Sequence, residues 1–289
     1  MRIPKYLLTP LIGAISVAAA HADVATTMPF AQATFVCERT VDPVPQEIYI
    51  AMIDLSDPAV VVRVARGGPD PDGEGKWETI LKRPTAIADI EHFDVVINGD
   101  FFEHLKQKDS TDASKSFVSG SPASVIGPAV SDGVFWGSNK AERPVFMIDD
   151  TGKASITTMK VPPSNARQVV AGDQLLVMEG KNVAPPDLPG EQNEIAPRTA
   201  VGLKNEGQTL VLMVIDGRHP TRAVGMTYHQ EAQIMLKLGC TSALNLDGGG
   251  SSVLAIRDSK TGKIQIMNHP SGGEERPVAN VLGVSIKSQ

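Results

Sequence analysis

Most apolar residues of this chain fall into short runs separated by Gly, Pro, Asp and Ser. Residues 47–54 and 59–65 are two such runs, rich in Val and Ile, and Ser56-Asp57-Pro58 between them is typical of a turn. They predict two adjacent strands. Residues 209–215 are apolar almost throughout, which predicts a central strand buried on both faces. Further strands are predicted over residues 95–97, 134–137, 144–148, 154–158, 169–178, 198–202, 243–246, 253–257, 263–267 and 278–286.

Two segments have the apolar spacing of a helix. Within residues 85–93 the apolar side chains share one helical face, and Thr85 is the expected N-cap. The clearer helix is predicted over residues 227–238. Its start carries Thr227 and Gln230, which fit the S/T-x-x-E/Q capping box.

Three segments read as loops: residues 67–75, residues 103–132 and the Pro-rich residues 181–197. The second is long and polar for a loop in a compact domain, so we expect it to be either functional or mobile. No repeat and no internal linker stands out. The sequence therefore predicts one strand-rich α+β domain with mixed sheets, a few helices and a site at the strand ends.

Residues 1–22 have the features of a secretory signal peptide. Arg2 and Lys5 precede a mostly apolar run, and Ala20-His21-Ala22 is an A-x-A cleavage site. The alternatives are a membrane anchor and an ordinary first helix. Since Thr9-Pro10 interrupts the run, which falls short of the ~20 residues of a bilayer span, we expect cleavage near Ala22. The mature protein is then periplasmic or secreted, without stable membrane insertion.

Composition narrows the function classes. With 42% hydrophobic residues and a net charge of -6 over 289 residues, the chain has the profile of a globular protein. The acidic balance argues against a nucleic-acid partner, which favours basic surfaces. Two cysteines are too few for a disulfide scaffold. In an oxidising compartment Cys37 and Cys240 would either pair or remain as buried free thiols, and the sequence leaves both alternatives open.

Polar residues gather where the predicted buried strands end. Asp216 follows one strand, and Asp247 follows another and precedes Gly248-Gly249-Gly250-Ser251-Ser252. A triple glycine lets backbone N–H groups approach an anion, although Asp-Gly is also common in hairpin turns. Two carboxylates can divide acid, base and nucleophile roles at a glycosidic bond. The structural alternative for each aspartate is a turn or capping role.

Other residues at these ends suit anion or hydroxyl binding. Arg198 and Arg276 are candidates for bidentate phosphate contacts, and Asn98 either binds substrate hydroxyls or satisfies nearby backbone. The chain has no GxSxG, Walker, HExxH or GxGxxG motif. Its histidines have no metal-ligand spacing, so we expect no metal. A divalent cation near Asp216 and Asp247 is conceivable, but the spacing does not call for one.

Five motifs follow one another along the chain: Asn98-Gly99-x-Phe101-Phe102, Arg198-Thr199-Ala200-Val201-Gly202, Val214-Ile215-Asp216-Gly217-Arg218, Asn245-Leu246-Asp247-Gly248-Gly249-Gly250-Ser251-Ser252 and Arg276-Pro277-Val278-Ala279-Asn280. Together and in this order they resemble the phosphodiester glycosidase family. The resemblance runs from about residue 85 to the end of the chain, so we divide the domain into residues 23–84 and a family-like part over 85–289. Asp100 stands inside the first motif, where the family often has a small residue.

The resemblance implies hydrolysis of a sugar-1-phosphodiester at the C1–O bond, which releases the sugar and a phosphomonoester. Asp216 and Asp247 would then be the catalytic residues, and the substrate would be a sugar phosphate or polysaccharide. The alternatives are a non-catalytic carbohydrate-binding or envelope-assembly protein on the same fold, and a phosphodiesterase that cuts P–O. The candidate substrate-binding residues are Asn98, Arg198, Thr199, Asn245, Gly248, Gly249, Gly250, Ser251, Ser252 and Arg276.

Overall fold

The computed structural model describes residues 22–26, 30–41, 43–73, 75–105, 117–188 and 194–287. The predicted signal peptide lies outside these residues apart from Ala22. The largest sheet has eight strands in the order β1-β2-β3-β17-β16-β18-β14-β15. Their bounds are β1 Ala22–Thr26, β2 Ala33–Thr40, β3 Gln46–Asp54, β14 Gln174–Met178, β15 Lys181–Asn182, β16 Arg198–Lys204, β17 Thr209–Ile215 and β18 Ser242–Asn245.

Three smaller sheets complete the described fold. A five-stranded sheet has the order β20-β19-β6-β21-β4, a second has the order β10-β9-β13-β11-β12, and a three-stranded sheet has the order β5-β8-β7. Their bounds are β4 Val60–Arg66, β5 Thr79–Ile80, β6 Val95–Asn98, β7 Phe102–His104, β8 Pro122–Val125, β9 Val130–Ser131, β10 Val134–Phe135, β11 Arg143–Asp149, β12 Ala154–Met159, β13 Ala166–Ala171, β19 Leu254–Arg257, β20 Ile264–Ile266 and β21 Asn280–Ile286.

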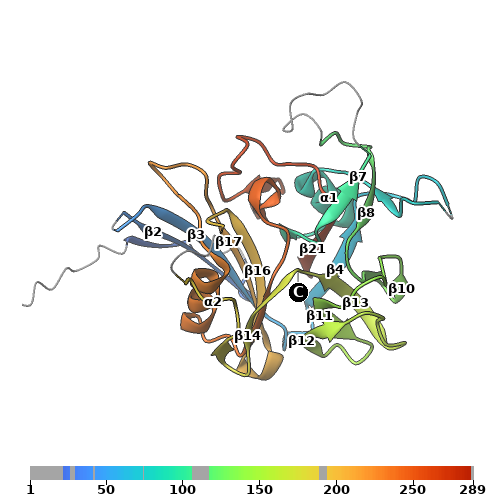
Figure 1. Cartoon of the computed structure of the whole chain (residues 1–289), viewed down its shortest axis with the longest axis horizontal. Helices are drawn as coiled ribbons and strands as arrows, with labels where there is room; N and C mark the ends of the chain where they lie inside the picture. Colours follow the sequence, from blue (N-terminus) through green and yellow to red (C-terminus); the bar gives the residue numbers. More distant parts are fainter. Residues whose placement is uncertain are drawn as a thin grey trace, which may run out of the picture.

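The eight-stranded sheet and the β20-β19-β6-β21-β4 sheet face each other across the main core (Figure 1). Strand β17 shows why both of its faces are buried. Leu210, Leu212 and Val214 point into the main core, whereas Val211 and Met213 point to the opposite face. The alternation follows from the two-residue period of a strand. The predicted central strand is therefore confirmed.

One helix covers the outer face of each large sheet. Helix α2 (Tyr228–Lys237) packs against β14, β16 and β18, and helix α1 (Pro84–Glu91) packs against β6 and β21 (Figure 1). The Thr227–Gln230 capping box of α2 is confirmed. Thr85 is not the N-cap of α1. Arg83 holds that position, because Pro84 supplies the fixed φ that suits the first helical turn.

Several predictions about strands and their pairing are wrong. Strands β3 and β4 lie in different sheets and are not neighbours. The predicted strand over residues 169–178 is two strands, β13 and β14, which separate at Gly172-Asp173 and join different sheets. Residues 103–132 contribute short strands to two sheets. Every strand pairing in the described ranges is antiparallel, so the expectation of mixed sheets is also wrong.

The two cysteines are free, buried thiols. Cys37 packs in the main core, and Cys240 packs beneath α2. Of the two alternatives left open by the sequence, the structure shows the unpaired one. Neither helix in the described part of the chain has the length and apolar character that crossing a membrane requires.

Gly283 sets how closely α1 and the turn after it approach β21. A Cβ at this position would lie 2.1 Å from Cδ2 of the buried Phe93 ring. We expect Gly283→Ala to lower the free energy of unfolding by about 1–3 kcal/mol, because the ring has no free space into which to move. Urea denaturation measures this. Gly272→Ala, whose Cβ would only make an ordinary contact of 3.9 Å with the carbonyl of Glu274, is the control, and equal stabilities for the two variants would contradict the packing argument.

Candidate active site

The loop that follows β18 is held in place by the side chain of Asn98, at the end of β6. The Asn98 amide nitrogen donates to the backbone carbonyl of Asp247 at 2.6 Å. Its oxygen accepts from Thr199 Oγ1 at 2.8 Å and from the backbone N–H of Val253 at 3.2 Å. Asn98 is fully buried. In this structure it therefore satisfies the backbone of the loop and does not face a ligand cavity.

A cavity of about 330 Å³ opens beside this loop. Its wall combines segments that are distant in the chain: the start of β16, the loop after β18, and residues that follow β17 and β20. Arginines, two carboxylates and backbone N–H groups share its wall. The lining residues are Phe101, Glu194, Ala196, Arg198, Arg218, Tyr228, Asp247, Gly248, Gly249, Gly250 and Arg276.

Three arginines make one side of this cavity positive. Arg198 lies 4.0 Å over the ring of Tyr228 and donates through Nε to the carbonyl of Met226 at 2.9 Å. Arg276 lies 4.0 Å over the ring of Phe117. Arg218 is the exposed member of the group. Stacking on aromatic rings leaves guanidinium N–H groups free in the ring plane, where they can bind phosphate.

The glycines of the loop allow neighbouring groups to lie very close to its backbone. A Cβ at Gly250 would lie 2.1 Å from Nη2 of Arg276, and one at Gly248 would lie 2.8 Å from the carbonyl of Pro197. A side chain at position 250 would therefore displace the guanidinium from the cavity. The triple glycine allows both the tight loop and the close packing of Arg276 against it.

Asp247 is the half-buried carboxylate of the cavity, whereas Glu194 is exposed and pairs with Arg218 at 3.3 Å. Burial raises its pKa to about 6, while a hydrogen bond from Ser251, the positive charge of Arg276 and the N–H of Gly248 favour the ionised form. The nearby Asp173 acts in the opposite direction. A carboxyl group that titrates near neutral pH can serve in proton transfer or, when ionised, as a nucleophile.

Asp173 is a second carboxylate close to the first, and the sequence analysis missed it. Tyr228 donates its hydroxyl proton to Asp173 Oδ2 at 2.6 Å, and Asn245 donates to Oδ1 at 2.8 Å. Asp173 lies in the turn between β13 and β14. Because residues 169–178 were predicted to be a single strand, no strand end was expected there. The signal that could have found it is Gly172-Asp173, a turn dipeptide within the run.

Behind Arg198 lies Glu231, a fully buried carboxyl group on α2. Neither of its oxygens has a hydrogen-bond partner among the described residues. Burial raises the pKa of Glu231 well above its ordinary value, and the charge of Arg198 opposes this. Glu231 therefore adds a polar group behind the arginine without lining the cavity.

Asp216 lies in a different environment from Asp247. It is 1% exposed and is absent from the wall of the cavity. Asn268 donates to its Oδ1 at 3.0 Å, and the backbone N–H of His269 donates to its Oδ2 at 2.9 Å. The expected carboxylate pair of Asp216 and Asp247 is thus not brought together in the cavity, because the end of β17 points toward the loop after β20.

Asp216 instead belongs to an ionic cluster with Glu47 and His269. Their ligating atoms lie within 4.8 Å of one another, a spacing that could hold a divalent cation. However, Arg39 contacts Glu47 at 3.0 Å, and Arg222 lies 3.3 Å from Glu47 and 3.9 Å from Asp216. These arginines already neutralise the carboxylates, so the cluster is satisfied as an ion-pair network that anchors the loop after β20.

The predicted site residues divide into two groups. Arg198, Asp247, the range 248–250 and Arg276 line the cavity. The other candidates are buried around it and act through hydrogen bonds or packing: Asn98, Thr199, Asp216, Asn245, Ser251 and Ser252. The sequence analysis also missed Arg218 and Tyr228 as cavity residues, although Arg218 follows a strand end within one of the quoted motifs and Tyr228 follows the helix N-cap.

A model of the phosphodiester glycosidase family matches residues 92–285. The chain belongs to this family. Its cavity-lining residues Arg198, Asp247 and Arg276 all lie within the matched range. The expected resemblance is therefore confirmed over the part of the chain that carries the cavity.

Individual proteins agree with this family assignment. The chain is 32% identical over 172 residues to the SPbeta prophage-derived protein YomE of Bacillus subtilis, which covers 56% of this chain and 26% of YomE. It is 42% identical over 64 residues to bovine N-acetylglucosamine-1-phosphodiester alpha-N-acetylglucosaminidase, which covers 22% of this chain and 12% of that protein. The chain thus spans about a quarter or less of the length of these relatives.

Solved structures share the fold of this chain. The catalytic domain of the zebrafish N-acetylglucosamine-1-phosphodiester alpha-N-acetylglucosaminidase, auto-inhibited by its pro-peptide, superposes with a TM-score of 0.62 at 19% identity, covering 92% of this chain and 88% of that one. A protein from Synechocystis gives a TM-score of 0.57 at 14% identity, covering 89% and 62% respectively. At these identities the likeness concerns the fold alone.

Asp100 holds the first motif in place, and its raised pKa makes the stability of the fold depend on pH. It is 2% exposed and accepts hydrogen bonds from the N–H of Ala171 at 2.9 Å and from the side chain of Asn280. Burial raises the pKa of Asp100 from 3.8 to about 7. Between these two values the unfolded chain is ionised at Asp100 while the folded chain keeps the proton, so the stability falls as the pH rises.

We expect Asp100→Asn to remove this dependence. From pH 5 to pH 8 the wild type should lose about 2–3 kcal/mol more stability than the variant, since each unit of pKa difference corresponds to about 1.4 kcal/mol. Urea denaturation at several pH values measures the difference. Parallel stability curves for the two proteins would show that Asp100 does not titrate in this way.

Proposed function

We propose that this protein hydrolyses the C1–O bond of a sugar-1-phosphodiester and releases the sugar and a phosphomonoester. Family membership supports a reaction on phosphodiesters of sugars. The observation that carries the proposal is the cavity itself, whose wall holds Arg198, Arg218 and Arg276 together with Asp247 and the glycine loop. Positive groups for a phosphodiester and a titrating carboxylate for the sugar carbon thus lie in one space.

The arginines would hold the phosphodiester. Arg276 has a single side-chain hydrogen bond among the described residues, a long one of 3.5 Å to Ser251 Oγ, so most of its donors are available. Arg198 already donates hydrogen bonds to the backbone carbonyls of Met226 and Glu194. Arg198 therefore orients the site, and Arg276 and Arg218 supply most of the contacts to the phosphate.

The carboxylates would act at the sugar carbon. Water oxygen bonds to C1, the C1–O bond breaks, and its electron pair stays on the phosphate oxygen. A phosphate leaving group stabilised by arginines needs little protonation, so the greater demand is to stabilise the positive charge that develops at C1. The negative charge of ionised Asp247 stabilises C1, and Asp247 either accepts the proton of the attacking water as base or first bonds C1 as nucleophile, to be displaced by water in a second step. Asp173, fixed by Tyr228 and Asn245, is the neighbouring carboxylate.

Asp216 would serve as a positioning residue. It bonds Asn268 and the backbone of His269, and the same loop continues to Arg276. Asn268 also donates to the carbonyl of Ser252, which closes the glycine loop. Asp216 thus connects the two segments that form the phosphate side of the cavity. This replaces the acid or base role that the sequence analysis assigned to it.

The place of action follows from the first residues. The signal-peptide pattern over residues 1–22 supports export, so the substrate would be met in the periplasm or outside the cell. Sugar phosphodiesters of envelope polysaccharides or lipid-linked sugars are the substrate class in that location. No nucleic-acid partner is proposed, since the net charge is -6.

Hydrolysis in oxygen-18 water tests the reaction. A panel of sugar-1-phosphodiesters is incubated with the protein, and the products are analysed by mass spectrometry. Label in the sugar is expected, because water attacks C1. Label in the phosphate would replace the proposal with a P–O phosphodiesterase, and turnover of no donor would favour a carbohydrate-binding protein on this fold.

Replacing Asp247 tests the carboxylate. We expect Asp247→Asn to lower kcat/KM by about a thousandfold or more while the fold stays intact. In the wild type, kcat/KM should rise as the pH increases through about 6, because the ionised form of Asp247 is the active one. Asp150→Asn, a change at an exposed turn, is the matched control. Wild-type turnover by Asp247→Asn would contradict the assignment.

A further inference from the structure

A second cavity adjoins the first at Phe101. It has a volume of about 190 Å³ and is lined by Phe101, Ile126, Gly127, Arg143, Ala171, Gly172 and Asp173. Phe101 belongs to the walls of both cavities. Asp173 lines the second cavity and lies close enough to Asp247, in the first, to raise its pKa. The two spaces therefore meet where the proposed chemistry takes place.

Arg143 is the unusual residue of this second cavity. It begins β11, and its Nε is buried without a hydrogen-bond partner in the described part of the chain. No hydrogen bond or ion pair of its guanidinium is found among the described residues. Asp173 is not its partner, because the Asp173 oxygens accept from Tyr228 and Asn245.

Arg143 is half-buried as a whole, but its buried and unpaired Nε is costly for the fold. Buried polar groups are almost always paired, and an unpaired one in a native structure calls for an explanation such as an ordered water or a ligand. The cavity has about the volume of six water molecules, at roughly 30 Å³ each, which is enough for a carboxylate or phosphoryl group. Both groups match the planar fork of a guanidinium.

We propose that Arg143 binds an anionic group, a carboxylate or a phosphoryl, carried by the sugar of the substrate. The proposal rests on the proposed function, which places C1 of the sugar beside Asp247 and Asp173. A sugar held there has its phosphodiester among the arginines of the first cavity. A substituent that extends past Phe101 on the other side then meets Arg143. Arg143 is thus a specificity-determining residue that selects an acidic sugar.

The local backbone supports a built subsite. Gly127 leaves room for the stem of Arg143, since a Cβ there would lie 3.4 Å from Arg143 Cγ and 2.3 Å from the Cβ of Ala171. Asp100 bonds the N–H of Ala171 and so ties the Phe101 segment to the strand that forms the cavity floor. The wall between the two cavities is therefore fixed by buried contacts.

Sugar-1-phosphodiester donors with and without an anionic group on the sugar test whether Arg143 selects an acidic sugar. Glucuronic acid 1-phosphodiester, glucose 1-phosphodiester 6-phosphate and glucose 1-phosphodiester, all with the same alcohol, are compared by kcat/KM. We expect at least one anionic donor to be preferred by about 10–100-fold, as for a charge-assisted hydrogen bond in a buried site. The favoured donor tells a carboxylate from a phosphoryl. A wild type without any preference for an anionic donor would overturn the proposal.

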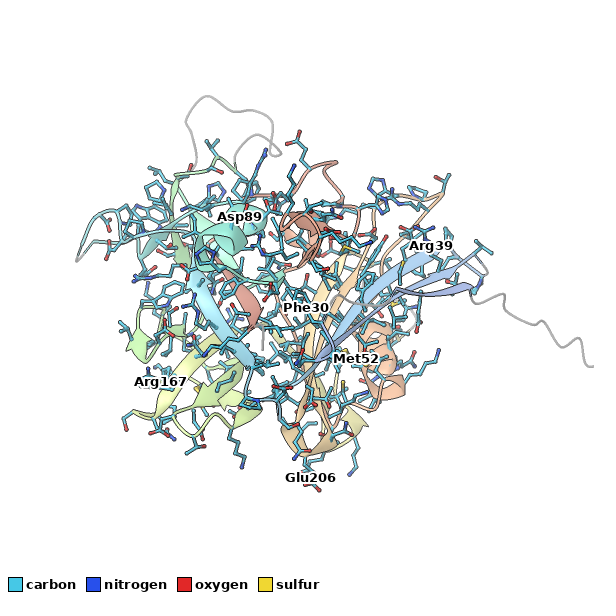
Figure 2. All side chains as sticks on the ribbon, turned by 180° about the vertical axis from the view of Figure 1, so that it is seen from behind. Phe30, Arg39, Met52, Asp89, Arg167 and Glu206 are labelled. Atoms are coloured by element: carbon cyan, nitrogen blue, oxygen red, sulfur yellow. The ribbon has the colours of Figure 1, made fainter. Side chains whose placement is uncertain are left out.

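Arg143→Met should bring the kcat/KM values of the anionic and neutral donors to within about threefold of each other. Arg143→Lys should keep part of the preference, because it keeps the charge. Arg167→Met is the matched control, since Arg167 is an exposed arginine on β13, the strand that pairs with β11 in the same five-stranded sheet (Figure 2). A preference that survives in Arg143→Met would overturn the proposal.

Binding measurements separate this inference from the proposed reaction. Glucuronate, glucose 6-phosphate and glucose are titrated into the wild type and into Arg143→Met by calorimetry. Tighter binding of an anionic sugar to the wild type than to the variant supports the subsite even where no donor is hydrolysed, and only the proposed function then fails. Equal binding of the anionic sugars to both proteins overturns the subsite.

Discussion

A single buried amide joins the two large sheets at the point where the cavity forms. Asn98 ends β6 of one sheet, Thr199 lies on β16 of the other, and the loop with Asp247 connects β18 to β19 between them. Because Asn98 is fully buried, its loss would leave a carbonyl and an N–H unpaired, at about 1–3 kcal/mol for each group. The position of the glycine loop, and with it that of Asp247, depends on these bonds.

Burial also sets the electrostatics of the cavity region. The pKa values of Asp247 and Asp100 rise to about 6 and about 7 because both carboxyl groups lose water. Asp247 keeps a functional charge through Arg276 and Ser251, whereas Asp100 holds a backbone loop. The same cause thus produces one group suited to chemistry and one suited to structure, and the neighbouring cations decide between them.

Local patterns predicted much of this fold. The capping box at Thr227 and Gln230 and the apolar run of β17 were found from spacing alone, because helix caps and strand periodicity are short-range properties. The motif with Asp247 and its glycines lines the cavity, where glycine permits the tight loop and the approach of Arg276. Pairing between strands was not predicted correctly, since β3 and β4 were expected to be adjacent but belong to different sheets.

The sequence by itself determined the strand-rich class, the capped helix and the segments that carry polar groups to the strand ends. Only the tertiary structure decided which of these groups share a cavity. Asp216 and Asp247 look equivalent along the chain, but the end of β17 turns its aspartate toward Asn268 and His269. Asp173, which looked like the middle of a strand, lies beside Asp247 instead. The physical reason is that side-chain direction at a strand end depends on the partner strand and on long-range packing, and neither is encoded in local spacing.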